Sequence, residues 1–116
     1  MFKRKKIQSY LQQKDTPSLF DQLLALYVSG NLTKQLKSWG LCHVSIYVDF
    51  HEEYRSMDIQ AKYFSYYYEW QFDEHECSYM IYKEAEPDEP TCLPYSMFED
   101  VDAVLCKMKL VIPKIP

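Results

Sequence analysis

The spacing of apolar residues changes at Gly40, and this change constrains the fold more than any other feature of the sequence. Before it, apolar side chains recur every three to four residues, as they do on one side of an α-helix. After it, the even positions from Cys42 to Phe50 are apolar and the odd positions are mostly polar. This alternation is typical of a strand with one buried face. We therefore expect helices up to Gly40 and a sheet after it.

The helical part divides into segments that the sequence marks at their ends. Residues 3–13 can form a short helix, and residues 17–31 form the strongest helical segment. In that segment Ser18 is followed three residues later by Asp21, which approximates a capping box. A further helical turn or two is expected before Gly40.

Three antiparallel strands are expected after Gly40, joined as a meander. The first strand covers residues 41–50 and the polar residues 51–58 form a connector. The second strand covers 59–72, and the third covers 77–84. A closing helix follows, with Ser96 and Glu99 in the arrangement of a capping box. The predicted fold class is α+β, with the N-terminal helices and the C-terminal helix packed on one face of the sheet.

The length of 116 residues fits one domain. It divides into a helical part (1–40), an antiparallel sheet (41–84), an acidic proline-rich loop (85–94) and a helix (95–110).

The sequence YFSYYYEWQF, residues 63–72, falls on the second expected strand. Aromatic side chains are favoured in strands, and we assign the even positions of this stretch to the core, namely Phe64, Tyr66, Tyr68, Trp70 and Phe72. The odd positions then lie on the opposite face, namely Tyr63, Ser65, Tyr67, Glu69 and Gln71. One face of a sheet cannot bury all the tyrosines of this region, so some rings are expected to be exposed.

Charge is distributed unevenly along the chain. Residues 49–102 carry fifteen acidic residues against three basic ones, a balance of −12, whereas the whole chain has a net charge of −4. Such an acidic region attracts basic partners and repels nucleic acid. No secretion signal follows the basic run at residues 3–6, and we expect a cytoplasmic protein with reduced cysteines.

Catalytic and metal-binding patterns are weak. Cysteine and histidine are the residue types that zinc prefers, but the four cysteines and three histidines show no spacing typical of a zinc site. We expect no metal and no other cofactor. His75 and Cys77 stand two residues apart, and a small enzyme or ligand-binding domain with a pocket near them is kept as an alternative. A homo-oligomeric structural subunit is a further alternative.

The combination of features resembles the small acidic immunity proteins of bacterial polymorphic-toxin and contact-dependent growth inhibition systems. The resemblance rests on the short single-domain chain, the acidic aromatic segment YFSYYYEWQFDEHECSYMIYKE, the acidic loop EAEPDEP, and the closing helix introduced by YSMFEDVDAV. It implies a non-enzymatic protein that binds a cognate toxin domain, often a nuclease with a cationic cleft, and that binds neither nucleic acid nor membrane.

Under this resemblance the partner contacts are expected on the tyrosine-rich face and on the acidic turns. Tyr63 and Tyr67 are the expected aromatic anchors. Charge complementarity is expected from Glu69, Asp73, Glu74, Glu76, Asp88 and Glu89.

Overall fold

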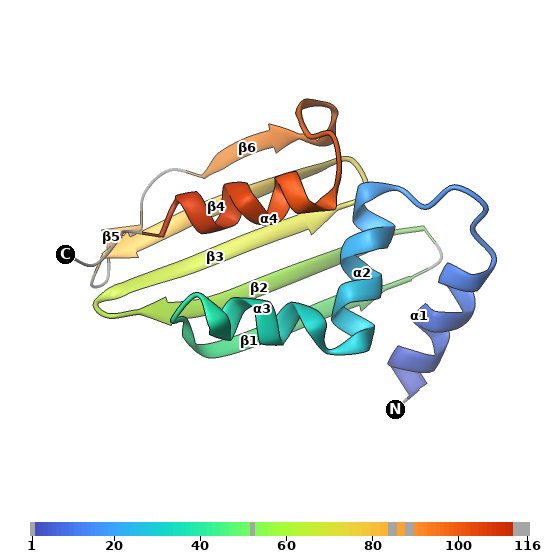
Figure 1. The fold of residues 1–116 in the computed structure, drawn as a ribbon, viewed down its shortest axis with the longest axis horizontal. Coiled ribbons are helices and arrows are strands. Elements are labelled where there is room, and N and C mark those ends of the chain that lie inside the picture. The colour runs from blue at the N-terminus through green and yellow to red at the C-terminus, as the bar shows by residue number, and fades with distance from the viewer. Residues whose placement is uncertain (1, 52, 84–85, 88–89, 113–116) are drawn as a thin grey trace.

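A computed structural model describes residues 2–51, 53–83, 86–87 and 90–112 of the chain (Figure 1). The helices are α1 (Phe2–Gln12), α2 (Leu19–Ser29), α3 (Asn31–Ser38) and α4 (Val101–Leu110), with a 3₁₀ turn at Tyr95–Met97. The strands are β1 (Cys42–Phe50), β2 (Arg55–Tyr63), β3 (Tyr66–Asp73), β4 (Glu76–Lys83), β5 (Glu86–Pro87) and β6 (Thr91–Pro94).

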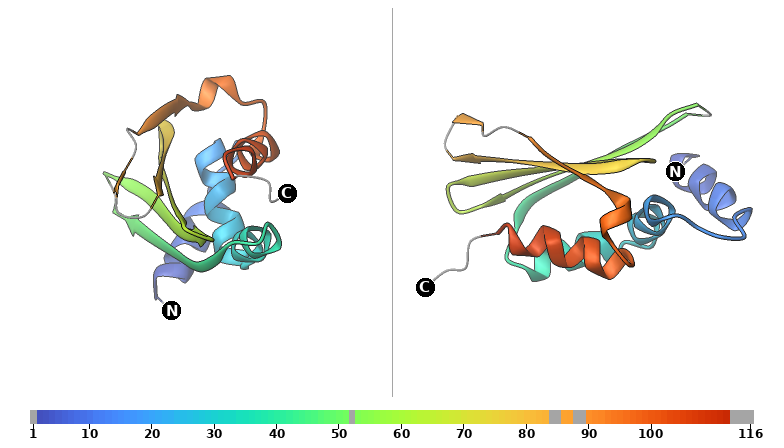
Figure 2. Two further views of the ribbon diagram at one scale, coloured as in Figure 1. Left: turned by 90° about the vertical axis from the view of Figure 1, so that its left-hand side faces the viewer. Right: turned by 90° about the horizontal axis from the view of Figure 1, so that it is seen from above.

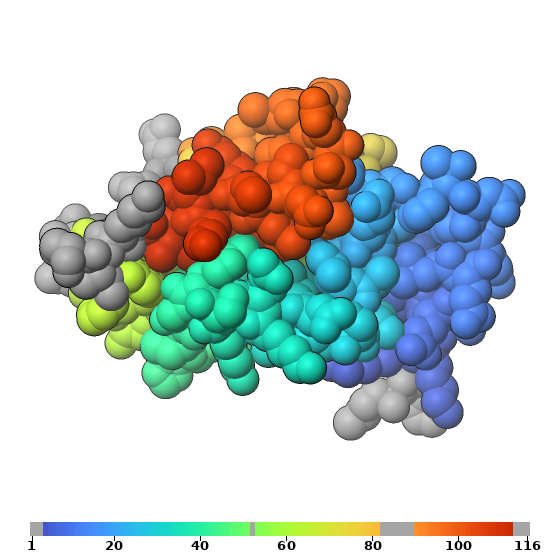
Figure 3. Space-filling model, in the orientation of Figure 1, coloured from blue at the N-terminus to red at the C-terminus, as the bar shows by residue number. Residues whose placement is uncertain are grey.

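The strands form one antiparallel sheet, and the helices gather on one side of it. The strand order is β1-β2-β3-β4-β5, and β6 pairs with β4 beside β5. Helices α2, α3 and α4 lie on one face of the sheet, whereas α1 stands at its end (Figure 2). Seen from that side, the helices hide most of the strands (Figure 3). The α+β class agrees with the sequence prediction, and the sheet has a second face that no described helix covers.

The expected three-stranded meander is wrong. Residues 59–72 do not form one strand, because the chain reverses at Phe64 and Ser65 and returns as β3. The strand before this turn, β2, begins at Arg55, inside the stretch that was expected to be a connector. Four long strands therefore follow one another, and the residues expected to form a loop at 85–94 add the two short strands β5 and β6.

The turn between β2 and β3 carries none of the usual sequence signals. Phe64 has a left-handed backbone with φ of 55°, and its neighbours Tyr63 and Tyr66 are paired across the hairpin. Two-residue hairpin turns that require a positive φ normally use glycine or asparagine. Here the side chain of Phe64 is 64% exposed, and its ring meets the ring of Tyr63 edge-on at a centroid distance of 4.9 Å.

The turn shifts the alternation of buried and exposed residues by one position. Tyr63 therefore lies on the helix-covered face and is only 9% exposed, so its expected place on the opposite face is wrong. Phe64, which was expected in the core, is in solvent instead. The assignments beyond the turn are confirmed, since Tyr68, Trp70 and Phe72 are buried.

Replacing Phe64 by glycine is expected to raise the free energy of unfolding by about 1 kcal/mol, because a non-glycine residue in the left-handed region costs about 1–2 kcal/mol. Loss of the ring contact with Tyr63 and the greater freedom of glycine in the unfolded chain reduce the gain. Urea unfolding followed by circular dichroism measures it. The control is Ser65→Gly, which relieves no positive φ and should give no gain. Equal gains from both variants would contradict the assignment of strain to Phe64.

A bulge interrupts β1 near its start. The pairing with β2 shifts between Cys42 and Ser45, and His43 within this interval has a positive φ of 53°. The alternation expected from the sequence therefore holds only in the second half of the strand, where Val48 and Phe50 are buried. Cys42, which was expected on the buried face, is exposed.

The ends of the helices follow local capping chemistry. At the start of α2 the side chain of Ser18 accepts from the backbone of Asp21 while the carboxylate of Asp21 accepts from the backbone of Ser18, so the predicted capping box is confirmed. At the start of α4 the cap is Asp100, whose carboxylate accepts from the backbone N–H of Ala103 at 2.9 Å. The helix thus begins later than the predicted residue 95 and does not use Ser96 as its cap.

The core lies between the helices and the covered face of the sheet. Its fully buried side chains are contributed by all four helices and the central strands: Ile7, Phe20, Leu23, Leu24, Leu32, Leu36, Met57, Ile59, Tyr68, Phe72 and Val104. No helix among the described residues is long and apolar enough to cross a membrane.

Candidate functional site

The face of the sheet turned away from the helices, called the open face below, carries polar and aromatic side chains in rows that cross the strands. Residues directly opposite one another in an antiparallel sheet lie on the same face. The pairing therefore places on this face, among others, Ser45, Tyr47, Asp49, Ser56, Asp58, Gln60, Lys62, Tyr67, Glu69, Gln71, Asp73, Glu76 and Ser78.

Within this set the charge is strongly negative. Five carboxyl groups stand against one lysine, Lys62. Large rings are exposed among them, since Tyr47 is 60% and Tyr67 is 45% exposed. The ammonium of Lys62 lies over the ring of Tyr67 at 5.3 Å from its centroid, so the one lysine of the set is already engaged in a cation–π contact. The open face therefore offers acceptors and aromatic rings rather than positive charge.

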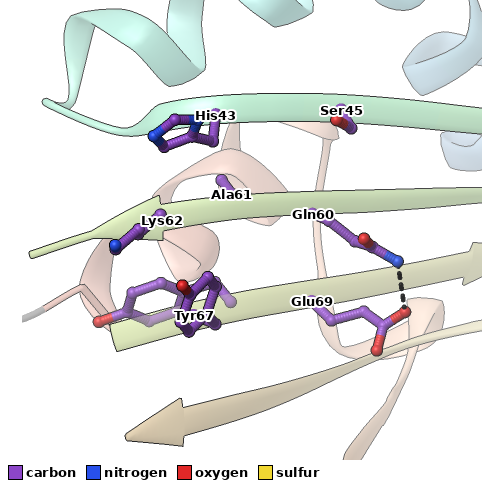
Figure 4. Close-up of a pocket in the computed structure, with 8 residues that line it drawn as sticks. His43, Ser45, Gln60, Ala61, Lys62, Tyr67 and Glu69 are labelled. Atoms are coloured by element: carbon purple, nitrogen blue, oxygen red, sulfur yellow. Dashed lines mark hydrogen bonds between the residues drawn. The ribbon is translucent and has the colours of Figure 1, made fainter. Parts of the chain in front are cut away.

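Among the residues that the structure describes, two hollows indent the open face. One, of about 430 Å³, lies over β1, β2 and β3 and is lined by His43, Gln60, Lys62, Tyr67 and Glu69 among others; we call it the histidine hollow (Figure 4). The other, of about 540 Å³, is lined among others by Tyr47, Tyr54, Asp49, Asp58, Asp73 and Glu76; we call it the acidic hollow. Both are large enough to accept a side chain of a partner.

The bulge in β1 positions one wall of the histidine hollow. The extra residue in β1 and the positive φ of His43 place its imidazole at the rim of the hollow (Figure 4). Bulges of this kind re-aim a side chain and are frequent at functional sites. The opposite wall is held by a hydrogen bond in which Gln60 Nε2 donates to Glu69 Oε2 at 3.3 Å.

A pair of carboxyl groups, Asp58 and Glu69, stands between the two hollows. Burial first and the neighbouring Glu69 carboxyl second raise the pKa of Asp58 from 3.8 to about 7, against the opposing effect of a hydrogen bond from Gln71. One oxygen of Asp58, Oδ1, is buried without a hydrogen-bond donor among the described residues. The pair therefore favours holding a proton near neutral pH.

The structure brings some of the predicted contact residues together and separates others. Tyr67, Glu69, Asp73 and Glu76 all lie on the open face, whereas Tyr63 is buried beneath it. Asp88 and Glu89 lie outside the described residues.

Two of the acidic residues predicted to contact a partner make interactions within this protein instead. The carboxylate of Asp73 accepts from the backbone N–H groups of His75 and Glu76 at 2.7 and 2.8 Å, which fixes the turn between β3 and β4. Glu74 Oε1 lies 2.7 Å from Arg55 Nη1 in an ion pair. Their replacement would disturb the fold, and Glu76 is the better probe of charge in this region.

The sequence placed Tyr47 and Asp49 on the face opposite the helices but did not include them among the expected contacts, and it missed Asp58 altogether. The alternation after Gly40 already placed Tyr47 and Asp49 on the polar side of the first strand, so a signal for them existed. Asp58 carried no such signal, because its stretch reads as a polar connector and only the pairing with β3 places it beside Glu69.

The surroundings of Cys77 do not activate its thiol as a pocket around His75 and Cys77 would require. Cys77 is buried on the covered face, and burial raises its pKa to about 11, so the thiol stays protonated at neutral pH. His75 is exposed in the turn that precedes β4. Among the described residues, no group of three or more histidine, cysteine, aspartate or glutamate side chains is placed to hold a metal ion.

No protein family, no curated protein and no solved structure matches this chain in comparisons with each. The geometry and chemistry of the open face therefore carry the functional proposal.

Proposed function

We propose that this chain is a protein-binding module without catalytic activity, and that it binds a basic protein through the open face. The observation that carries the proposal is the contrast between the two faces of one sheet. The face under the helices is packed with buried apolar side chains, whereas the described part of the open face presents at least five carboxyl groups and exposed tyrosine rings.

The chemistry of the open face suits recognition of another protein. Tyrosine is enriched at the centres of interfaces because a rigid ring buries much area and loses little conformational entropy. Tyr47 and Tyr67 supply such rings from two different strands. Carboxylates around them accelerate encounter with a cationic surface and disfavour other acidic surfaces. The same repulsion disfavours two copies of this chain meeting through their open faces.

The class of partner follows from the resemblance to immunity proteins. We propose that the partner is a cognate bacterial toxin domain, and that a nuclease would suit the open face. Its substrate-binding cleft is cationic, and the carboxylates of Asp49, Asp58 and Glu76 would occupy the positions that phosphates take in the substrate.

Reversing two charges on the open face is expected to weaken this complex. With the protein encoded beside this chain as partner, the double variant Asp49→Lys, Glu76→Lys should lower affinity at low salt by at least tenfold, about 1.4 kcal/mol. Both side chains are exposed and line the acidic hollow, so their reversal tests charge without opening the core. Isothermal titration calorimetry at low and high salt measures the effect, which should shrink as salt rises.

The matched control is the double variant Asp15→Lys, Glu99→Lys, which makes the same change in net charge at two exposed residues outside the open face. It should leave the affinity within about twofold of the unmodified protein. Equal losses in both variants would show that only net charge matters. Unchanged affinity in the first variant would remove the open face from the interface.

A further inference from the structure

We propose that binding of the cationic partner at the open face releases the proton that Asp58 and Glu69 hold between them, so that the complex tightens as pH rises from about 6 to about 8. This inference rests on the proposed function, because it requires a cationic surface to approach the open face. It adds to the proposed function that pH regulates partner binding at the open face.

The register of the sheet puts the two carboxyl groups beside each other. Asp58 pairs with Gln71 and Glu69 pairs with Gln60, so the two acids are diagonal neighbours on adjacent strands. Asp58 lines the acidic hollow and Glu69 lines the histidine hollow, so each hollow has one member of the pair in its wall. A cationic side chain entering either hollow comes close to the pair.

One oxygen of Asp58 has no hydrogen-bond donor among the described residues when the pair is fully ionised. Two carboxylates accept and cannot donate, so a bond between them needs one proton. That oxygen of Asp58, Oδ1, is buried. The side chains of Gln71 and Gln60 stabilise the ionised forms of Asp58 and Glu69 respectively by hydrogen bonds. A proton held by the pair lets Asp58 and Glu69 form the hydrogen bond that two ionised carboxylates cannot make.

The other groups that face the pair come from the neighbouring strands. On β1, Tyr47 stands opposite Asp58 and Asp49 follows it, and on β3 Asp73 lies on the other diagonal. Lys62 on β2 and Met80 on β4 flank Glu69. His43 lines the same hollow as Glu69, so a histidine control is needed.

The sign of the effect follows from proton linkage. The pKa of Asp58 is raised by burial and by Glu69, so the folded free protein binds more protons than the unfolded chain between about pH 4 and about pH 7. Its free energy of unfolding therefore falls as pH rises through that window. A partner cation beside the pair favours the ionised form, so the proton leaves to solvent on binding and affinity rises with pH.

The first arm of the test uses the free protein. Carboxyl carbon NMR of protein labelled at aspartate and glutamate should show a resonance that titrates near pH 7 and that Asp58→Asn removes, with Glu69→Gln as a second variant. In urea unfolding, Asp58→Asn should flatten the fall in stability between about pH 4 and about pH 7. If no carboxyl titrates above about pH 6, the inference is overturned whatever binds to the open face.

The second arm uses an N-acetylated hexa-arginine amide as the cationic probe. Its affinity should rise about tenfold between pH 6 and pH 8, the ratio expected when a group of pKa about 7 must be ionised. Asp58→Asn should remove most of this rise, whereas His43→Gln should keep it. Calorimetry in phosphate and in Tris should report proton release near pH 7.

The outcomes separate this inference from the proposed function. A pH dependence that persists in Asp58→Asn and disappears in His43→Gln overturns the inference but leaves a cation-binding face. A titrating carboxyl with no binding of the probe at either pH overturns the coupling together with the proposed cationic partner.

Discussion

Replacing Trp70 by alanine is expected to lower the free energy of unfolding by about 3–5 kcal/mol, the range found for large aromatic side chains in protein cores. Trp70 is 2% exposed, and its ring stacks on that of Tyr68 with centroids 5.3 Å apart and planes 8° apart. It borders the same crevice as Val104 and Met108 of α4. Truncation leaves a cavity between sheet and helix that the surrounding elements cannot easily close. Urea unfolding followed by circular dichroism measures the loss.

The matched control for Trp70→Ala lies on the other face of the same strand. Tyr67 is 45% exposed on the open face, and Tyr67→Ala should cost less than about 1 kcal/mol of stability. It should nevertheless weaken partner binding, whereas the folded fraction of Trp70→Ala should bind normally. Similar stability losses in the two variants would contradict the division into a covered and an open face. A loss below about 1 kcal/mol for Trp70→Ala would contradict its place in the core.

The helical layer could be predicted because its signals are local. Ser18 and Asp21 cap α2 from within one turn, and Leu23 and Leu24 follow Phe20 at i+3 and i+4, the spacing that places all three toward the core. Such features depend on near neighbours in the chain and are visible in the sequence. The α+β class followed from the change of spacing at Gly40.

The number of strands could not be predicted because the sequence gives no clear signal for the turn between β2 and β3. Phe64 and Ser65 sit within a run of aromatic residues that reads as one continuous strand, and neither is a usual hairpin residue. The pairing of the long strands on both sides outweighs the cost of a left-handed phenylalanine. One turn therefore changed the strand count and moved Tyr63 from the open face to the covered one.

The candidate site was predicted only in part, for a related reason. Tyr67 and Glu69 were placed correctly on the open face because both follow the alternation within one strand. Glu76 was expected in a turn, and it lies instead at the start of β4. The pairing of Asp58 with Glu69 could not be found, since diagonal neighbours depend on the register between two strands. Register is a property of the folded sheet, and here it follows from the unexpected turn.

Replacing Asp21 by alanine is expected to lower the free energy of unfolding by about 2–4 kcal/mol, because one buried carboxylate serves two helices. Asp21 is 3% exposed. Its Oδ2 accepts from the backbone N–H of Ser18 at 3.0 Å, and its Oδ1 accepts from the hydroxyl of Tyr10 at 2.9 Å. The first bond caps α2, and the second ties α1 to it. Burial raises the pKa of Tyr10, so its hydroxyl keeps the proton that it donates.

The control for Asp21→Ala separates the effect of the bond that caps α2 from the effect of the bond that links α1 to α2. Tyr10→Phe removes only the hydroxyl and should cost about 1 kcal/mol, while the ring keeps its edge-on contact with Phe50 at 5.2 Å. The double variant should cost less than the two single losses added together, since both remove the same bond. Strict additivity would show that Asp21 acts on α2 alone. Hydrogen exchange should then find α1 as protected in Asp21→Ala as in the unmodified protein, and the proposed tie between the helices would be rejected.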